Sequence, residues 1–234
     1  MRSSPASEEW IWVAEGIRIA VLASGEGTNL QAIMDSCAGR EIPGEVVVVV
    51  SNKPGAHALW RARRAGVPAI LLDHREFPTR EPFEARLAET LRADSVDLVC
   101  LAGWLRILGP AFVRQFAGRI MNIHPSLLPL FGGRGMYGER VHEAVLSAGM
   151  KISGCTVHFV DETSDGGPII LQAVARVQED DTPSSLGARI AEEEHRLYPL
   201  AIRLFAEGRL LIEGRKVGIV EARKREPVAS EVSR

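Results

Sequence analysis

The feature that most constrains the fold is an alternation, through the first half of the chain, between short apolar runs and segments of helical spacing. Five consecutive valines at 46–50 are typical of a parallel strand buried on both faces of a sheet. Apolar runs of strand length lie at 17–22, 45–50, 69–72, 98–102 and 120–123. Apolar side chains recur at helical spacing in the intervening segments 30–37, 56–65 and 83–92. This alternation predicts a Rossmann-like, doubly wound α/β fold with a mostly parallel sheet.

The second half of the chain should extend this sheet with antiparallel strands. Two β-rich runs, 156–160 and 169–177, are joined by a long polar connection, which indicates an antiparallel pair. We also expect polar or Gly-rich loops at 74–81 and 127–138, helices at 141–148 and 183–207, and a short strand at 210–212. The whole pattern predicts a single domain at 17–212, an N-terminal extension at 1–16 and a charged, frayed tail at 213–234.

Composition excludes several classes of protein. With a net charge of −2, the chain of 234 residues has no basic footprint for nucleic acid. No apolar run reaches the length of a membrane span, and the first residues lack the order of a signal peptide. The three cysteines are far apart and have no metal-ligand spacing. We therefore expect a cytoplasmic protein without metal, nucleic-acid or membrane partners.

A glycine-rich turn at 24–29 follows the first predicted strand and opens the first helix. Backbone N–H groups and the helix dipole favour an anion at such a place. The turn is not a Walker A loop, and Leu30 stands where a dinucleotide fingerprint has its third glycine. NAD is therefore disfavoured, and a phosphate monoester is the better candidate. Glu26 would have to point to solvent, and a plain tight turn is the alternative interpretation.

Asn122 and His124 stand at the end of the fifth predicted strand, immediately before Pro125. Residues i and i+2 of an extended chain point to the same side, and the residue before proline is held extended. The carboxyl ends of parallel strands are where ligands bind in open α/β sheets. An amide can donate to a developing oxyanion, and an imidazole can do so or transfer a proton. The alternative is a strand end whose polar side chains only satisfy the backbone.

Other charged residues have a functional and a structural interpretation. Asp165, in an Asp-Gly-Gly-Pro loop, could orient His124 and favour its protonated form, or could bond to its own turn. Arg80 and Arg106 could bind carboxylates or lie on the surface. His158 alternates with apolar neighbours on a strand, so a structural role is expected.

Three motifs together resemble phosphoribosylglycinamide formyltransferases, folate-dependent enzymes of purine synthesis. They are the Asn-x-His-Pro-Ser-Leu-Leu-Pro run at 122–129, the Ser-Gly-x-Gly-Thr-Asn turn at 24–29 and the Asp-Gly-Gly-Pro loop at 165–168. The resemblance covers about 17–212 and implies a formyltransferase fold. It also implies transfer of the formyl group of 10-formyltetrahydrofolate to the amine of glycinamide ribonucleotide.

The resemblance assigns a role to each catalytic candidate. Asn122 would donate to the formyl oxygen, protonated His124 would stabilise the oxyanion, and Asp165 would hold His124 and assist proton transfer through water. The substrate phosphate and ribose would contact Gly27, Thr28, Asn29 and Glu194. The folate would contact Arg80, Leu105, Arg106, Ile107, Leu108, Val113, Val160, Asp161, Thr163 and Asp165. The resemblance also divides the domain into a phosphate-binding half to about 118 and a catalytic and folate-binding half after it, although six of the folate residues, from Arg80 to Val113, precede 118.

The resemblance has one departure and leaves alternatives. Segment 131–138 is richer in glycine than the Pro-Gly-Leu-His version of the family and lacks its histidines, so its substrate contacts stay open. Methionyl-tRNA formyltransferase would need a further C-terminal domain, and formyltetrahydrofolate deformylase an N-terminal one. A non-catalytic phosphate-binding module would not need Asn122, His124 and Asp165. The oligomeric state is open, with a homodimer as one alternative.

Overall fold

The valine run forms one of five parallel strands at the centre of the protein. In the computed structural model, which describes residues 16–221, β2 occupies Gly44–Ser51 and its last six residues are buried. The other parallel strands are β1 (Ile17–Leu22), β3 (Ala69–Leu71), β4 (Leu98–Leu101) and β5 (Ile120–His124). Their order is β3-β2-β1-β4-β5, so the chain winds outward from β1 first in one direction and then in the other. The predicted doubly wound fold is therefore confirmed.

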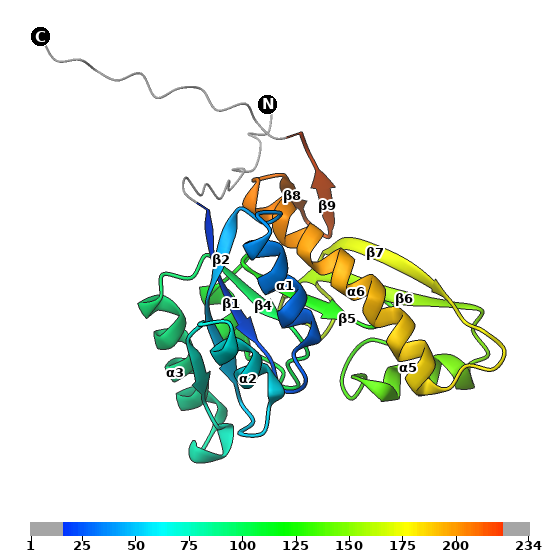
Figure 1. Ribbon diagram of the computed structural model, residues 1–234, viewed down its shortest axis with the longest axis horizontal. Helices are drawn as coiled ribbons and strands as arrows, with labels where there is room; N and C mark the ends of the chain where they lie inside the picture. The colour runs from blue at the N-terminus through cyan, green and yellow to red at the C-terminus, as the bar shows by residue number, and fades with distance from the viewer. Residues whose placement is uncertain (1–15, 222–234) are drawn as a thin grey trace, which may run out of the picture.

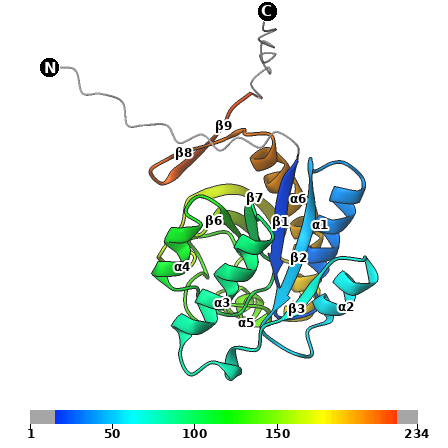
Figure 2. The same cartoon turned by 90° about the vertical axis from the view of Figure 1, so that its left-hand side faces the viewer.

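Helices cover both faces of the sheet because successive side chains of each strand point to opposite faces. In β1, Ile19 and Val21 belong to one hydrophobic cluster, whereas Ala20 and Leu22 belong to the other. Helices α1 (Thr28–Ala38), α2 (His57–Arg64), α5 (Glu139–Ser147) and α6 (Pro183–Ala206) contribute to the first cluster, and α3 (Arg80–Ala93) and α4 (Pro110–Gln115) to the second. Figures 1 and 2 show the two groups on opposite sides of the sheet.

Antiparallel strands continue the sheet beyond β5, as the sequence predicts. β6 (Ile152–Phe159) pairs antiparallel with β5, and β7 (Ile169–Arg176) pairs antiparallel with β6. The register of the first pair places Asn122 opposite His158. Helix α6 packs across both new strands (Figure 1). The polar strand end thus gains a neighbour from a segment 36 residues later in the chain.

Regular structure continues beyond 212, into the segment predicted as a frayed tail. β8 occupies Leu210–Glu213, and Lys216–Ile219 form a further strand, β9, which pairs with β8 and meets β7 at Ile169. Only two of the four residues of β9 are large and apolar, which is too short a pattern to indicate a strand from sequence. The rest of the predicted extension and tail, 1–15 and 222–234, lies outside the described residues.

The expected polar loop at 74–81 is also shorter than predicted. It contains a 3-10 turn, η1 (His74–Glu76), and α3 begins inside it at Arg80. Pro82 does not prevent this, because the N–H groups of a first helical turn have no partner within the helix. Arg80 is therefore held by a helix rather than by a loop. No helix within 16–221 has the length and apolar character needed to cross a membrane.

Candidate active site

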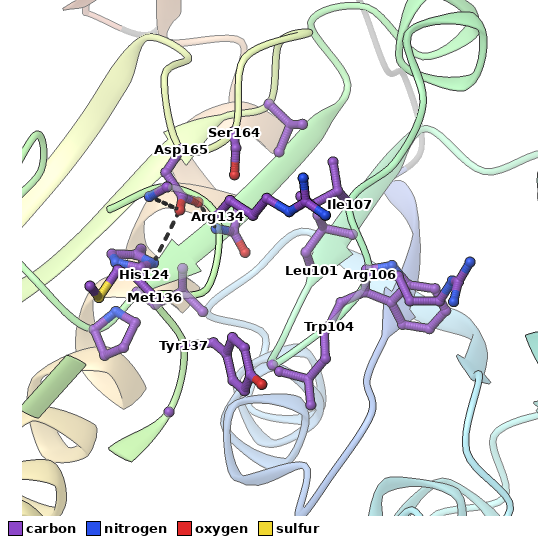
Figure 3. Close-up of a pocket in the computed structure, with 18 of the residues that line it drawn as sticks. Leu101, Trp104, Arg106, Ile107, His124, Arg134, Met136, Tyr137, Ser164 and Asp165 are labelled. Carbon is purple, nitrogen blue, oxygen red and sulfur yellow. Dashed lines mark hydrogen bonds and ion pairs between the residues drawn. The ribbon is translucent and has the colours of Figure 1, made fainter. Parts of the chain in front are cut away.

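A cavity of about 670 Å³ opens at the carboxyl ends of β4 and β5. Segments 103–108, 122–125, 133–138 and 160–165 form most of its wall, and α6 closes one end. Figure 3 shows side chains from these segments converging on one space. The cavity is therefore built from loops that are far apart in the sequence and meet at the edge of the sheet where α/β proteins bind ligands.

His124 is held in this cavity by both ring nitrogens. Its side chain is almost fully buried, and its Nε2 lies 2.9 Å from the carbonyl oxygen of Phe131. A carbonyl only accepts, so Nε2 carries a proton and donates it there. Its Nδ1 faces the Oδ2 atom of Asp165 at 3.8 Å (Figure 3). That distance is an ion-pair distance rather than a hydrogen bond, which leaves Nδ1 room for another partner.

Asp165 reaches the centre because its loop folds tightly. Its own backbone is left-handed, with φ of 51°, and its Oδ2 accepts the N–H of Gly133 at 2.8 Å. A Cβ atom at Gly167 would lie 1.8 Å from the carbonyl oxygen of Phe159, so only glycine fits there. The Asp-Gly-Gly-Pro motif is thus a requirement of close packing against β6, and this packing points the carboxylate toward His124.

His158 is a site residue that the sequence interpretation missed. Its Nδ1 lies 2.8 Å from the carbonyl oxygen of Phe159 and therefore carries the proton. Its Nε2 is then an acceptor, and the Nδ2 of Asn122 donates to it at 3.1 Å. Burial lowers the pKa of His158, which favours this neutral form. The role of His158 follows from the register between β5 and β6, which cannot be read from a single sequence.

The Asn122 amide is therefore oriented with its nitrogen toward His158 and Asp165. One N–H faces His158, and Nδ2 also lies 3.5 Å from the Oδ1 of Asp165. The second contact is long, so the second N–H can turn to another acceptor without breaking a strong bond. Asn122, His124 and Asp165 are brought together as the sequence led us to expect.

At the α6 end of the cavity, Asn29 and Glu194 form a buried pair. The Nδ2 of Asn29 donates to the Oε2 of Glu194 at 2.8 Å. Burial raises the pKa of the Glu194 carboxyl to about 7, against the opposing effect of the Asn29 hydrogen bond. A buried carboxylate of this kind can accept hydrogen bonds from the hydroxyl groups of a ligand.

The glycine-rich turn leads into this end of the cavity at Asn29. Gly27 precedes α1 with φ of 72°, and a Cβ there would lie 2.8 Å from Ala58. Gly27 and Thr28 lie beside the cavity rather than in its wall. The Glu26 side chain is 80% exposed and turned toward His57. It therefore points to solvent, as an anion site at this turn would need.

At the other end, the predicted folate residues line the wall with one exception. Leu105, Arg106, Ile107, Leu108, Val160, Asp161 and Thr163 all face the cavity. Val113 does not: it is buried on α4 against the α3 side of the sheet. This corrects the expectation that Val113 lines the pocket. A short amphipathic helix turns such a residue to the core.

Two arginines stand near this end of the cavity. The Nε of Arg80 lies 3.9 Å from Glu84, whose Oε1 also accepts the N–H of Gly109 at 2.8 Å. The Arg106 guanidinium lies over the ring of Phe83. Both side chains line the cavity and are positioned by α3, so a ligand carboxylate placed there would meet preorganised cations.

The glycine-rich segment 131–138 also contributes to the cavity wall. Arg134 extends across the cavity toward Ile107 (Figure 3). Within the described residues it makes no hydrogen bond or ion pair, whereas Tyr137 packs under Arg140. In the same part of the chain, no group of three or more His, Cys, Asp or Glu side chains is arranged to hold a metal ion.

The doubly wound sheet and the partly buried Asn–His–Asp centre at its ligand-binding edge define an α/β enzyme. Residues 17–202 match the formyl transferase family. The chain is 45% identical over 194 residues to the phosphoribosylglycinamide formyltransferase of Escherichia coli (strain K12), across 83% of this chain and 89% of that protein. This chain belongs to the formyl transferase family.

Two further relatives bear on the extent of the match. The chain is 47% identical over 197 residues to the trifunctional purine biosynthetic protein adenosine-3 of Drosophila melanogaster, of which it spans only 14%. Among solved structures, glycinamide ribonucleotide transformylase 1 from Symbiobacterium toebii has a TM-score of 0.85 and 53% identity, over 92% of this chain and 100% of that one. The likeness therefore extends over the whole sheet.

Proposed function

We propose that this protein transfers the formyl group of 10-formyltetrahydrofolate to the amine of glycinamide ribonucleotide. The products are formylglycinamide ribonucleotide and tetrahydrofolate, in purine biosynthesis. The observation that carries the proposal is that Asn122, His124 and Asp165 lie together in one cavity. One end of this cavity is reached by the glycine-rich turn, and the other has an apolar wall with two arginines. The similarity to a phosphoribosylglycinamide formyltransferase, over 83% of this chain and 89% of that protein, supports it.

In this proposal, Asn122 and His124 act on the formyl oxygen. When the amine attacks the formyl carbon, that oxygen gains negative charge. In this scheme, the second N–H of Asn122 and a protonated Nδ1 of His124 donate to that oxygen. Donors that are oriented before the reaction stabilise such charge without reorganisation, and each is worth about 3–4 kcal/mol of barrier.

Asp165 has two functions in the same scheme. Its Oδ2 lies 3.8 Å from the Nδ1 of His124 and orients the imidazole ring. It also accepts the proton that the amine loses as the new C–N bond forms, and this proton passes to the folate nitrogen when the C–N bond of the formyl donor breaks. The Gly133 N–H, which donates to its Oδ2 at 2.8 Å, keeps the carboxylate in place.

The two ends of the cavity bind the two substrates. The backbone N–H groups of Gly27, Thr28 and Asn29 donate hydrogen bonds to the phosphate. The carboxylate of Glu194 accepts hydrogen bonds from the ribose hydroxyl groups. The pterin of the formyl donor lies along 105–108 and the loop 160–165, and its tail carboxylates approach Arg80. Arg106 and the exposed side chains of Leu105 and Ile107 complete that wall. A cytoplasmic location and a homodimer stay predictions.

The proposal is tested with the purified full chain, glycinamide ribonucleotide and 10-formyltetrahydrofolate or its dideaza analogue. We expect formylglycinamide ribonucleotide to form in proportion to the folate product. A reaction without the nucleotide is the control, and it should release little formate. Absence of formyl transfer, or formate release that is independent of the nucleotide, would exclude the proposed function.

A further inference from the structure

Ser24 opens the glycine-rich turn, yet its side chain points away from the place where a phosphate would bind. It is only 4% exposed. Its hydroxyl donates to the Oδ1 of Asn52 at 2.6 Å and accepts the backbone N–H of Leu105 at 3.0 Å. Both of these directions are occupied, and the only O–H donor points to Asn52, so the hydroxyl has no donor left for a phosphate oxygen.

The partner Leu105 is the first residue of the wall at 105–108. Its N–H has no other acceptor among the described residues. The backbone N–H of Ser24 also donates to the carbonyl oxygen of Gly103 at 3.1 Å. Ser24 therefore binds both ends of the turn 103–105, which places the half-exposed Leu105 side chain at the cavity.

These contacts lie where the sheet changes its winding direction. β1 stands between β2 and β4, and Ser24, Asn52 and Gly103 come from the segments that follow these three strands. Asn52 is 2% exposed and fixes the hydroxyl from the β2 side. Hydrogen bonds in such buried places are costly to lose, because each partner left behind is desolvated and unpaired.

We infer that Ser24 is a positioning residue for the formyl-folate wall and not a ligand of the nucleotide phosphate. This inference deepens the proposed function and rests on it. In the sequence, Ser24 is part of the glycine-rich turn expected to bind phosphate. In the structure, its hydroxyl instead contacts the wall of the neighbouring substrate site. Its hydroxyl holds the main chain at Leu105, and the orientation of 105–108 depends on that bond.

The test is Ser24→Ala in the full chain, with KM measured separately for each substrate. We expect the KM for the formyl donor to rise about five- to tenfold, as the loss of one buried hydrogen bond would give. The KM for glycinamide ribonucleotide should stay within about twofold, because no phosphate contact is removed. A larger rise for the nucleotide than for the folate would overturn the inference and return Ser24 to the phosphate site.

Ser51→Ala is the matched control. Ser51 is fully buried at the end of the adjacent strand β2, and its hydroxyl contacts only the backbone of Lys53. Its removal should leave both KM values unchanged. If Ser51→Ala raises the folate KM as much as Ser24→Ala does, the effect is general destabilisation and the inference fails.

Asn52→Ala gives a second, graded variant. It removes the acceptor that orients the Ser24 hydroxyl but leaves the bond to Leu105, so its folate effect should be smaller than that of Ser24→Ala. If Ser24→Ala turns over too slowly for KM to be measured, the affinity of the dideaza folate analogue is measured by calorimetry for Asn52→Ala and for the wild type. An equal affinity in the two proteins overturns the inference. An inactive wild type would instead contradict the proposed function, so the two failures are distinguishable.

Discussion

At the scale of single residues, the centre depends on which ring nitrogen of each histidine carries a proton. His158 donates through Nδ1 to its own strand and accepts the Asn122 amide through Nε2. His124 donates through Nε2 to Phe131 and turns Nδ1 to Asp165. The two imidazoles are therefore fixed in different ways, His158 as an acceptor for the Asn122 amide and His124 as a donor to the Phe131 carbonyl.

His158→Phe should lower kcat about tenfold while substrates still bind. The ring keeps most of the buried volume but no longer accepts from Asn122, whose amide can then rotate, and an oriented buried hydrogen bond is worth about 1 kcal/mol or more. A double-mutant cycle with Asn122→Ala should be strongly non-additive, because both changes remove the same orientation. Additive losses in kcat would mean that His158 acts independently of Asn122.

Glu194 makes a pH-dependent contribution to stability with a definite sign. Its pKa is raised by burial to about 7 in the folded protein, above its ordinary value of 4.5. The folded state therefore binds the extra proton, and the associated stability is present below the unfolded pKa and is lost as pH rises through about 7.

Replacement Glu194→Gln removes this titration. The free energy of unfolding, measured by urea at pH 5 and pH 8, should fall more steeply with pH in the wild type than in the variant. The difference between the two slopes isolates Glu194 from other titrating groups. A wild type and variant with equal slopes would show that the carboxyl has an ordinary pKa.

At the scale of elements, the sequence predicted what local pattern specifies. The strand-helix alternation located β1 to β5, and the motif at 122–129 located the end of β5. The sequence did not reveal features that depend on strand pairing between distant segments. His158 acquires its role through a register with Asn122, and β9 exists only because β8 and β7 are there to pair with it. Val113, which the resemblance assigned to the folate, lies in the core on the six-residue helix α4, because packing sets which face of so short a helix is buried.

The loop 161–168 depends on its glycines at this scale. Gly167→Ala would place a Cβ against the Phe159 carbonyl at 1.8 Å, so either the loop or β6 must move. We expect a loss of more than about 2 kcal/mol in the free energy of unfolding, or a displaced Asp165 with a large fall in kcat. Gly55→Ala, with no atom within 4 Å of the added Cβ, is the control and should change neither.

At the scale of the whole molecule, the sheet order decides where the chemistry lies. The winding direction changes at β1, so the turns after β1 and β4 meet there, and β5 adds Asn122 and His124 alongside. The antiparallel strands β6 and β7 then carry His158 and the loop with Asp165 back to the same edge. In the proposed function, one half of the fold supplies the turn for a phosphate, and the other supplies Asn122, His124 and Asp165.

The central claim is that Asp165 serves the transfer step of this cavity rather than its architecture. The most direct measurement compares Asp165→Asn with the wild type, using a formyl donor labelled with carbon-13 and following the label into the nucleotide. We expect transfer to slow by about a hundredfold or more, as for loss of a general acid–base group, while calorimetric binding of the dideaza folate analogue stays within about threefold. Near-normal transfer of the label by Asp165→Asn would contradict the account.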